Sequence, residues 1–203
     1  MGVMVPVIFR QADVEGQAGP INAGLLCIFG TVERSFKCRT TLGDVWVVSD
    51  DEHITRVCFS APMGIAEGGR ASILLEARDQ LEAYLNGRAK SFDLPLKPKG
   101  TAYQQRVWEA LCAIPYGNTT TYAQLVTVLG GGTVARAVGT ACSANPLPIL
   151  IPCHRVVSST GGLAGYLGGL EWKRRLLGWS GALLVFSLNI QSELFDGRCH
   201  AIR

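Results

Sequence analysis

The stretch Pro146–Val157 constrains this chain more than any other, because three prolines within seven residues exclude a helix. Proline fixes φ and lacks the backbone N–H, so the apolar run Leu147–Ile151 must follow an extended or turning path. A cysteine beside a histidine and an arginine comes directly after this run, in Pro152–Arg155. Core packing gives no reason for this placement, so Cys153 is the candidate nucleophile.

Cys153 needs an activating neighbour if it is to react. A free thiol has a pKa near 8.5 and is only about 3% thiolate at pH 7. His154 and Arg155 are adjacent and provide a base and a cation. The alternative is a buried structural cysteine in a strand, followed by a chance histidine. The Cys-His pair by itself leaves that alternative open, because buried free cysteines are common.

Composition sets the class of protein. The 203 residues are 48% apolar, enough for one large domain or two small ones. Seven cysteines without CxxC or CxxH spacing predict reduced thiols in a nuclear or cytoplasmic protein that is not secreted. The longest apolar runs are far shorter than the roughly 20 residues that span a bilayer, so we expect no membrane segment. His53, His154 and His200 are far apart in the sequence, and an adjacent pair such as Cys199-His200 usually occurs by chance. We therefore expect no metal site.

Positive charge is concentrated in one part of the chain. Residues 101–180 carry six Lys and Arg against two Asp and Glu, a net charge of +4, whereas residues 1–100 have a net charge of −1. This block contains Cys153 and suits an anionic partner. Four charges could equally belong to an ordinary solvated face.

The first half of the chain predicts a small antiparallel sheet covered by one helix. Residues 1–35 show no sustained period and predict a loosely packed arm with one short strand, Leu25–Phe29. A turn at Gly43-Asp44 precedes the expected strand Val45–Val48, which we pair with Ile54–Phe59. Apolar residues at helical spacing predict a helix over Ser72–Leu85.

A connection rich in proline and glycine, Leu94–Gly100, lies where the charge changes sign. We therefore expect a domain over residues 36–97, a second over 98–181, and a tail of unknown role over 182–203.

The second half predicts three short helices. Thr101 with Gln104, and Thr121 with Gln124, each form a capping-box pattern, and the second helix should stop at the glycines 130–132. Thr133 is the expected cap of a third helix, which ends before Asn145-Pro146.

Two short helices joined by a glycine turn are typical of a helix-turn-helix. The alternative interpretation, a plain helical hairpin in a bundle, is not excluded by this pattern. Arg136 favours DNA binding, because it is one long cation among small residues that let a helix approach a groove closely.

Several motifs together resemble the O6-alkylguanine-DNA alkyltransferases, also called methylated-DNA-protein-cysteine methyltransferases. The resemblance runs from about Tyr103 to Leu177, and more weakly back to about Thr40. It rests on Ala-Arg-Ala-Val-Gly at 135–139, Asn145-Pro146, Ile-Pro-Cys-His-Arg-Val at 151–156, Gly165-Tyr166 and Gly-Gly-Leu at 168–170. It implies an α+β protein with an RNase H-like N-terminal domain and a helical C-terminal domain carrying a winged helix-turn-helix.

The resemblance also implies an activity. The protein would flip an alkylated guanine out of double-stranded DNA and move the alkyl group from O6 of guanine to Cys153, with O4 of thymine as a second candidate source of the alkyl group. It would do so once per molecule, as a monomer without a cofactor, in the nucleus or cytoplasm, or in the nucleoid if prokaryotic.

Particular residues take roles by resemblance. Arg136 would fill the place of the extruded nucleotide, and His154 would activate Cys153. The Tyr122 hydroxyl would bind N3 of the base and neutralise charge that grows on it. The other DNA-binding residues would be Thr121, Ala135, Gly139 and Ser143, and the pocket would comprise Asn145, Pro148, Val156, Ser159, Tyr166, Leu167 and Gly168.

One position departs from the family pattern. Ser180 stands where the family has a glutamate that orients the histidine. A serine hydroxyl could hold the imidazole tautomer but hardly raise its basicity, so we expect slower alkylation near neutral pH unless Glu171 or Glu193 substitutes. This departure leaves a second function open, a module that binds alkylated DNA without efficient transfer. A sequence-specific transcription factor is a weaker third reading, because the second helix of the motif has few side chains able to read base edges.

Overall fold

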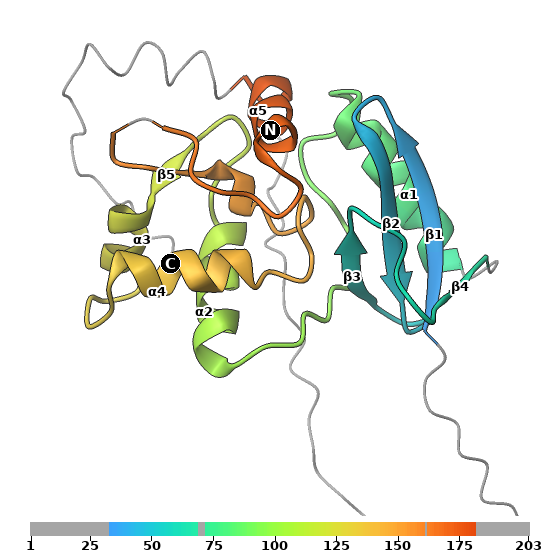
Figure 1. Ribbon diagram of the computed structural model, residues 1–203, viewed down its shortest axis with the longest axis horizontal. Coiled ribbons are helices and arrows are strands. Elements are labelled where there is room, and N and C mark those ends of the chain that lie inside the picture. The colour runs from blue at the N-terminus through green and yellow to red at the C-terminus, as the bar shows by residue number, and fades with distance from the viewer. Residues whose placement is uncertain (1–32, 69–71, 161, 182–203) are drawn as a thin grey trace, which may run out of the picture.

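The computed structural model describes residues 33–68, 72–160 and 162–181, which form two domains side by side (Figure 1). The predicted strand Leu25–Phe29 and the tail over 182–203 lie outside the described residues. The first strand begins at Arg34, so the arm expected over residues 1–35 overlaps the sheet at its end.

The N-terminal domain contains a four-stranded sheet with the order β3-β2-β1-β4. Its strands are β1 (Arg34–Thr40), β2 (Gly43–Ser49), β3 (Ile54–Cys58) and β4 (Ala66–Glu67). β2 and β3 pair in antiparallel fashion as predicted. β1, which was not predicted as a strand, pairs antiparallel with β2, and β4 runs parallel to β1. The sheet is therefore mixed rather than wholly antiparallel.

The turn between β1 and β2 has two residues, as predicted, but lies two residues earlier in the chain. Gly43 is the first residue of β2 and pairs with Thr40, so the loop comprises Thr41 and Leu42. The Thr40 hydroxyl donates to the Gly43 carbonyl (2.6 Å) and accepts from the Leu42 N–H (3.1 Å). These bonds close a two-residue hairpin, and Gly43 supplies the positive φ that follows it.

Helix α1 (Ser72–Leu85) has the predicted bounds and covers one face of the sheet (Figure 1). Its buried side chains are Ile73, Leu74, Ala77, Leu81 and Tyr84, which recur at helical spacing. Tyr84, at the end of the helix, packs its ring against Phe92 and Tyr116, with centroids 4.6 and 5.8 Å away. Since Tyr116 belongs to the second domain, the helix that covers the sheet also contacts that domain.

Main-chain hydrogen bonds fix the two domains to each other. The connection runs beside β3, where the Ile54 N–H donates to Pro95 O (2.8 Å) and the Lys97 N–H donates to Ile54 O (3.0 Å). Val57, also in β3, donates its N–H to the carbonyl of Pro146 (2.8 Å). The proline-rich stretch of the second domain is thereby anchored to the edge of the first domain's sheet.

The C-terminal domain is mainly helical. Its helices are α2 (Ala102–Cys112), α3 (Tyr122–Val128), α4 (Ala135–Ser143) and α5 (Leu170–Trp179). Both predicted capping boxes are present, at Thr101 with Gln104 and at Thr121 with Gln124. No helix among the described residues has the length and apolar character needed to cross a membrane.

The turn between α3 and α4 consists of three glycines. Gly130, Gly131 and Gly132 all have φ between +68° and +85°, a conformation that other residues rarely adopt. The prediction that Thr133 caps α4 is wrong. Val134 occupies the N-cap position without a side-chain bond, while the Thr133 hydroxyl is 2.9 Å from the Tyr103 hydroxyl and ties the turn to α2.

Close packing at Gly100 yields a prediction about stability. A Cβ there would lie 2.4 Å from the buried indole of Trp108, whose N–H is held by the Ala141 carbonyl. We expect Gly100→Ala to lower the free energy of unfolding by about 1–3 kcal/mol through overpacking. Thermal unfolding measures this loss. Gly165→Ala is the control, since a Cβ at Gly165 meets nothing within 4 Å, and equal stability of the two variants would contradict the prediction.

Candidate active site

Cys153 is the first residue of a one-turn 3-10 helix, η1 (Cys153–Arg155), and does not lie in a strand. Pro152 precedes this turn, and the Cys153 N–H bonds back to the Ile151 carbonyl (2.8 Å). The strand β6 (Val156–Val157) follows and pairs in parallel with β5 (Thr120–Thr121). Because α3 begins directly after β5, this pairing brings Tyr122 close to the reactive cysteine.

Asn145 braces the stretch that leads to the cysteine. Its side-chain oxygen accepts from the Leu147 N–H (3.0 Å), and its Nδ2 donates to the Ile151 carbonyl (3.0 Å). The same nitrogen lies 3.2 Å from the Cys153 sulfur. One buried amide therefore fixes the turn and places a donor on the thiol.

Opposing effects act on the ionisation of Cys153. Burial has the largest effect and leaves the pKa of the thiol above its ordinary value, although the Asn145 amide, the Lys173 ammonium and the main-chain N–H groups of Cys153 and His154 lower it. Lys173 is 0% exposed in α5 and donates its Nζ to the Ala164 carbonyl (3.0 Å). The sequence reasoning missed this lysine. It could have been recognised as a lysine among the apolar residues on the buried face of a helix, between Trp172 and Leu176.

His154 is fully buried and surrounded by cations. Burial, Arg155 and Lys173 hold the pKa of its imidazole well below the ordinary value. Its Nε2 lies 3.4 Å from the hydroxyl of Tyr84, to which Arg155 also donates (3.2 Å). Its Nδ1 is buried and has no hydrogen-bond partner among the described residues. These surroundings favour a neutral imidazole.

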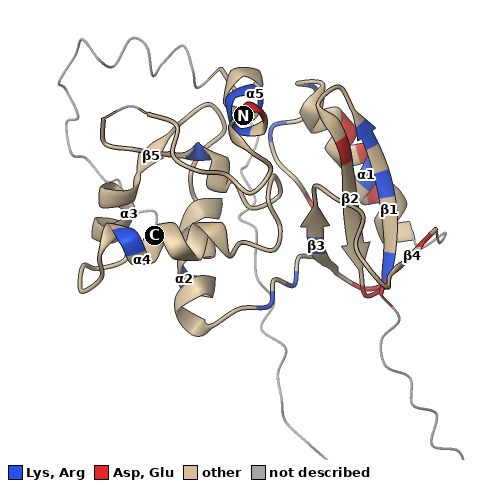
Figure 2. Ribbon diagram, in the orientation of Figure 1, with Lys and Arg blue, Asp and Glu red and all other residues tan. Residues whose placement is uncertain are grey.

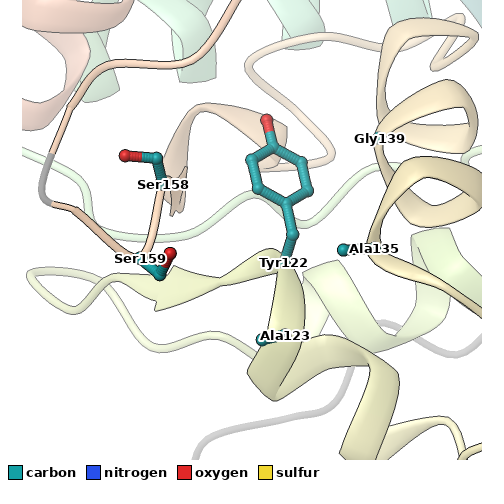
Figure 3. Close-up of a pocket in the computed structure, with 6 residues that line it drawn as sticks. All are labelled: Tyr122, Ala123, Ala135, Gly139, Ser158 and Ser159. Atoms are coloured by element: carbon teal, nitrogen blue, oxygen red, sulfur yellow. The ribbon is translucent and has the colours of Figure 1, made fainter.

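A pocket of about 280 Å³ opens beside α3 and α4 (Figure 3). It is lined by Tyr122, Ala123, Ala135, Gly139, Ser158 and Ser159. Figure 3 shows the Tyr122 ring standing between the segment with Ser158 and Ser159 and the helix with Gly139. Burial, with the nearby thiols of Cys142 and Cys153, raises the pKa of Tyr122 to about 12. Its hydroxyl therefore stays protonated and can donate a hydrogen bond.

The predicted DNA-binding residues lie on α3 and α4 or at their ends. Arg136 is exposed in the first turn of α4, and Figure 2 shows this helix with one basic stretch among uncharged residues. Ala135 and Gly139 line the pocket. Thr121 uses its hydroxyl to cap α3, and the exposed Ser143 donates its hydroxyl to the Gly139 carbonyl (3.0 Å).

Only some of the residues predicted to form the pocket line it, and others are buried in the core behind it. Ser159 lines the pocket, whereas Pro148 and Val156 are buried in the core. Tyr166 and Gly168 lie in the loop before α5, and Leu167 between them is 61% exposed. That loop packs against the first domain.

Phe59 of the N-terminal domain holds this loop, and the sequence reasoning did not find it. Its ring centroid lies 5.8 Å from that of Tyr166 and 5.1 Å from that of Trp172. A Cβ at Gly168 would come within 2.7 Å of the Phe59 ring, so a glycine is required for this approach. An aromatic residue just after a strand gives little sequence signal for such a contact.

Comparison with known proteins identifies the family. A family model described as "6-O-methylguanine DNA methyltransferase, ribonuclease-like domain" matches residues 36–98, and the corresponding "DNA binding domain" model matches residues 102–182. A Bacillus subtilis methylated-DNA–protein-cysteine methyltransferase is 39% identical over 137 residues, which cover 64% of this chain and 83% of that protein. This chain belongs to the methylated-DNA–protein-cysteine methyltransferase family.

Other relatives of the family agree in sequence and structure. A protein of the same name from Methanosarcina barkeri is 53% identical over 102 residues, half of this chain and 65% of that relative. The crystal structure of Mycobacterium tuberculosis O6-methylguanine methyltransferase superposes with a TM-score of 0.68 at 33% identity, covering 76% of this chain and 99% of that one. The RNase H-like and helical two-domain fold expected from the resemblance is confirmed.

Ser180, at the position of the expected glutamate, does not contact His154 through a hydrogen bond. Its hydroxyl donates to the Leu177 carbonyl (2.9 Å), because the last carbonyls of a helix lack partners within the helix. The expectation that this hydroxyl holds the imidazole tautomer is therefore wrong. Glu171 does not substitute, since it pairs with Arg174 and Arg175 on the exposed face of α5. Glu193 lies outside the described residues.

The charge of Lys173 leads to a prediction about pH. Its ammonium lowers the pKa of Cys153, so Lys173→Met should raise that pKa and reduce the thiolate fraction at pH 7. We expect alkylation of Cys153 by iodoacetamide, followed by peptide mass spectrometry, to slow by about tenfold at pH 7. The variant should recover as pH rises past the new pKa of the thiol.

Arg174→Met is the matched control, because it removes a cation from the exposed side of the same helix. A pH midpoint that is the same in Lys173→Met, Arg174→Met and the parent protein would show that Lys173 does not stabilise the thiolate.

Proposed function

We propose that this protein repairs DNA by transferring an alkyl group from O6 of guanine to Cys153, once per molecule. The observation that carries the proposal is the buried Cys153 thiol, to which the Asn145 amide donates a hydrogen bond and whose thiolate the Lys173 ammonium stabilises by its charge. Tyr122, which lies near Cys153, lines the pocket. Family membership supports the same activity, since the relatives are named for it.

The reaction needs no group beyond the protein and the damaged base. The thiol proton of Cys153 passes to solvent, and the thiolate attacks the alkyl carbon in line with the bond to O6. A sulfur–carbon bond forms, the carbon–oxygen bond breaks, and its electron pair passes to the guanine. The Tyr122 hydroxyl donates to the base as this charge grows, and the guanine takes up a proton. The product is a thioether, which thiol exchange does not reverse, so the protein is consumed.

Double-stranded DNA is the proposed partner, and the protein acts on it as a monomer in the compartment that holds DNA. O6 of guanine is inaccessible within the stack, so the nucleotide must be extruded. Arg136 would fill the vacated place, while the small residues Ala135 and Gly139 let α4 approach the minor groove. The Mycobacterium tuberculosis relative has been crystallised in complex with DNA; that chain is 34% identical, its TM-score is 0.68, and the alignment covers 73% of this chain.

A second function, binding of alkylated DNA without transfer, accounts for the site less well than alkyl transfer does, because it gives no role to the groups around the Cys153 thiol. Ser180 is the feature that suggested this alternative, because it leaves His154 without a carboxylate. The thiol of Cys153 nevertheless has the hydrogen bond from Asn145 and the charge of Lys173, and neither of them involves residue 180.

Stoichiometry tests the proposal directly. We expect a duplex oligonucleotide containing O6-methylguanine to add one methyl group to the protein, on the peptide that contains Cys153, as measured by intact and peptide mass. The methylated amount should never exceed the amount of protein, and Cys153→Ser should stay unmodified. Multiple turnovers, or a methyl group on another residue, would refute single-use transfer to Cys153.

The extrusion role of Arg136 predicts a substrate-dependent loss. Arg136→Ala should slow repair of duplex DNA by about ten- to a hundredfold, while reaction with free O6-benzylguanine stays within twofold, since a free base needs no extrusion. Arg39→Ala is the control, because it removes an exposed arginine from the N-terminal domain. An equal loss on both substrates would exclude the extrusion role.

A further inference from the structure

Tyr84 brings a hydroxyl from the N-terminal domain to the buried His154–Arg155 pair. It stands 70 residues before His154 in the chain, at the end of α1. Tyr84 is 1% exposed and His154 is 0% exposed, so water does not compete freely for these groups. The hydroxyl lies 3.4 Å from Nε2 of His154 and 3.2 Å from a terminal nitrogen of Arg155.

Hydrogen-bond accounting assigns the direction of each bond. A guanidinium can only donate, so the Tyr84 oxygen accepts from Arg155. If Nε2 of His154 also donated to this oxygen, the Tyr84 hydrogen would be left buried without an acceptor among the described residues. If the Tyr84 hydroxyl donates to Nε2 instead, its hydrogen is satisfied, and Nδ1 lacks a partner in either arrangement. Both arrangements contain two hydrogen bonds, but the second leaves one fewer buried polar group without a partner among the described residues and is favoured.

We propose that Tyr84 is a positioning residue that fixes His154 as a neutral imidazole with its proton on Nδ1, a task that the resemblance assigned to the missing glutamate. In this state Nε2 accepts the hydrogen bond from Tyr84 and Nδ1 carries the ring proton. Its meaning for alkyl transfer rests on the function proposed above.

The surroundings of His154 agree with a neutral ring. The charged and titratable groups that face it are Arg155 on its own turn, Lys173 on α5, Tyr84 on α1 and Tyr166 in the loop before α5. Both charged groups are cations, which disfavour an imidazolium. Lys173 is then the cation that balances the Cys153 thiolate, and the N-terminal domain acts on His154 through the Tyr84 hydroxyl.

The test compares Tyr84→Phe with Tyr116→Phe in the full chain. Both variants remove one hydroxyl from the same aromatic cluster, but the Tyr116 hydroxyl bonds to the Trp179 carbonyl and not to His154. Long-range ¹H–¹⁵N NMR reports the tautomer of His154, and mass spectrometry follows alkylation of Cys153 by free O6-benzylguanine.

In the parent protein and in Tyr116→Phe we expect the Nδ1–H tautomer and equal rates within twofold. Tyr84→Phe should shift the tautomer equilibrium toward Nε2–H and slow alkylation by about ten- to a hundredfold, as loss of a partner behind a functional histidine does. An Nε2–H tautomer in the parent protein, or an unchanged tautomer in Tyr84→Phe, would overturn the inference. The parent measurement stands even if the variant fails to fold. A parent protein that shows the Nδ1–H tautomer but never alkylates would refute the proposed function and support the assignment of Tyr84.

Discussion

Burial of the Cys153 thiol is the constraint on which the rest of the site depends. Burial shields the thiol from water, but it also raises the pKa of the thiol and opposes formation of the nucleophile. Groups from outside its own turn therefore add to the main-chain N–H groups of Cys153 and His154 in lowering that pKa. Asn145 comes from the end of α4 and Lys173 from α5, so the sulfur is reactive only when these helices are correctly packed. Stability of the C-terminal domain and reactivity of the cysteine are thus coupled.

The N-terminal domain is part of this arrangement rather than a separate module. Val57 anchors the start of the proline-rich stretch through the Pro146 carbonyl, and Phe59 packs against the loop that carries Tyr166 and Gly168. Tyr84 reaches the pair that follows Cys153. These three contacts come from one sheet and its helix, and they hold the turn, the loop and the imidazole behind the cysteine. The exposed surface of α3 and α4 around the pocket is available to a substrate.

Among the described residues no carboxylate bonds to His154, and this changes the chemistry expected of the site. In a Cys-His pair supported by a carboxylate, the histidine carries a positive charge while the thiol is ionised. Here Arg155 and Lys173 already provide positive charge next to the ring, and a further charge on the imidazole would be repelled. The arrangement separates two tasks. Lys173 provides the charge that stabilises the thiolate, and His154 provides a fixed neutral neighbour.

The sequence by itself determined the features that depend on local interactions. The capping boxes at Thr101 and Thr121, the glycine turn at 130–132 and the bounds of α1 follow from residues within one or two helical turns, and the Cys-His motif marked the nucleophile. Tertiary structure decided which distant groups meet. The contacts of Tyr84 with His154 and of Phe59 with Tyr166, and the effect of the Lys173 charge on the thiol, join segments whose spacing in the chain carries no periodic signal. Thr133 was wrongly assigned for the same reason, since its hydroxyl bonds to Tyr103, which only the fold brings near it. Ser180 differs, because its hydroxyl bonds locally to a carbonyl at the end of its own helix.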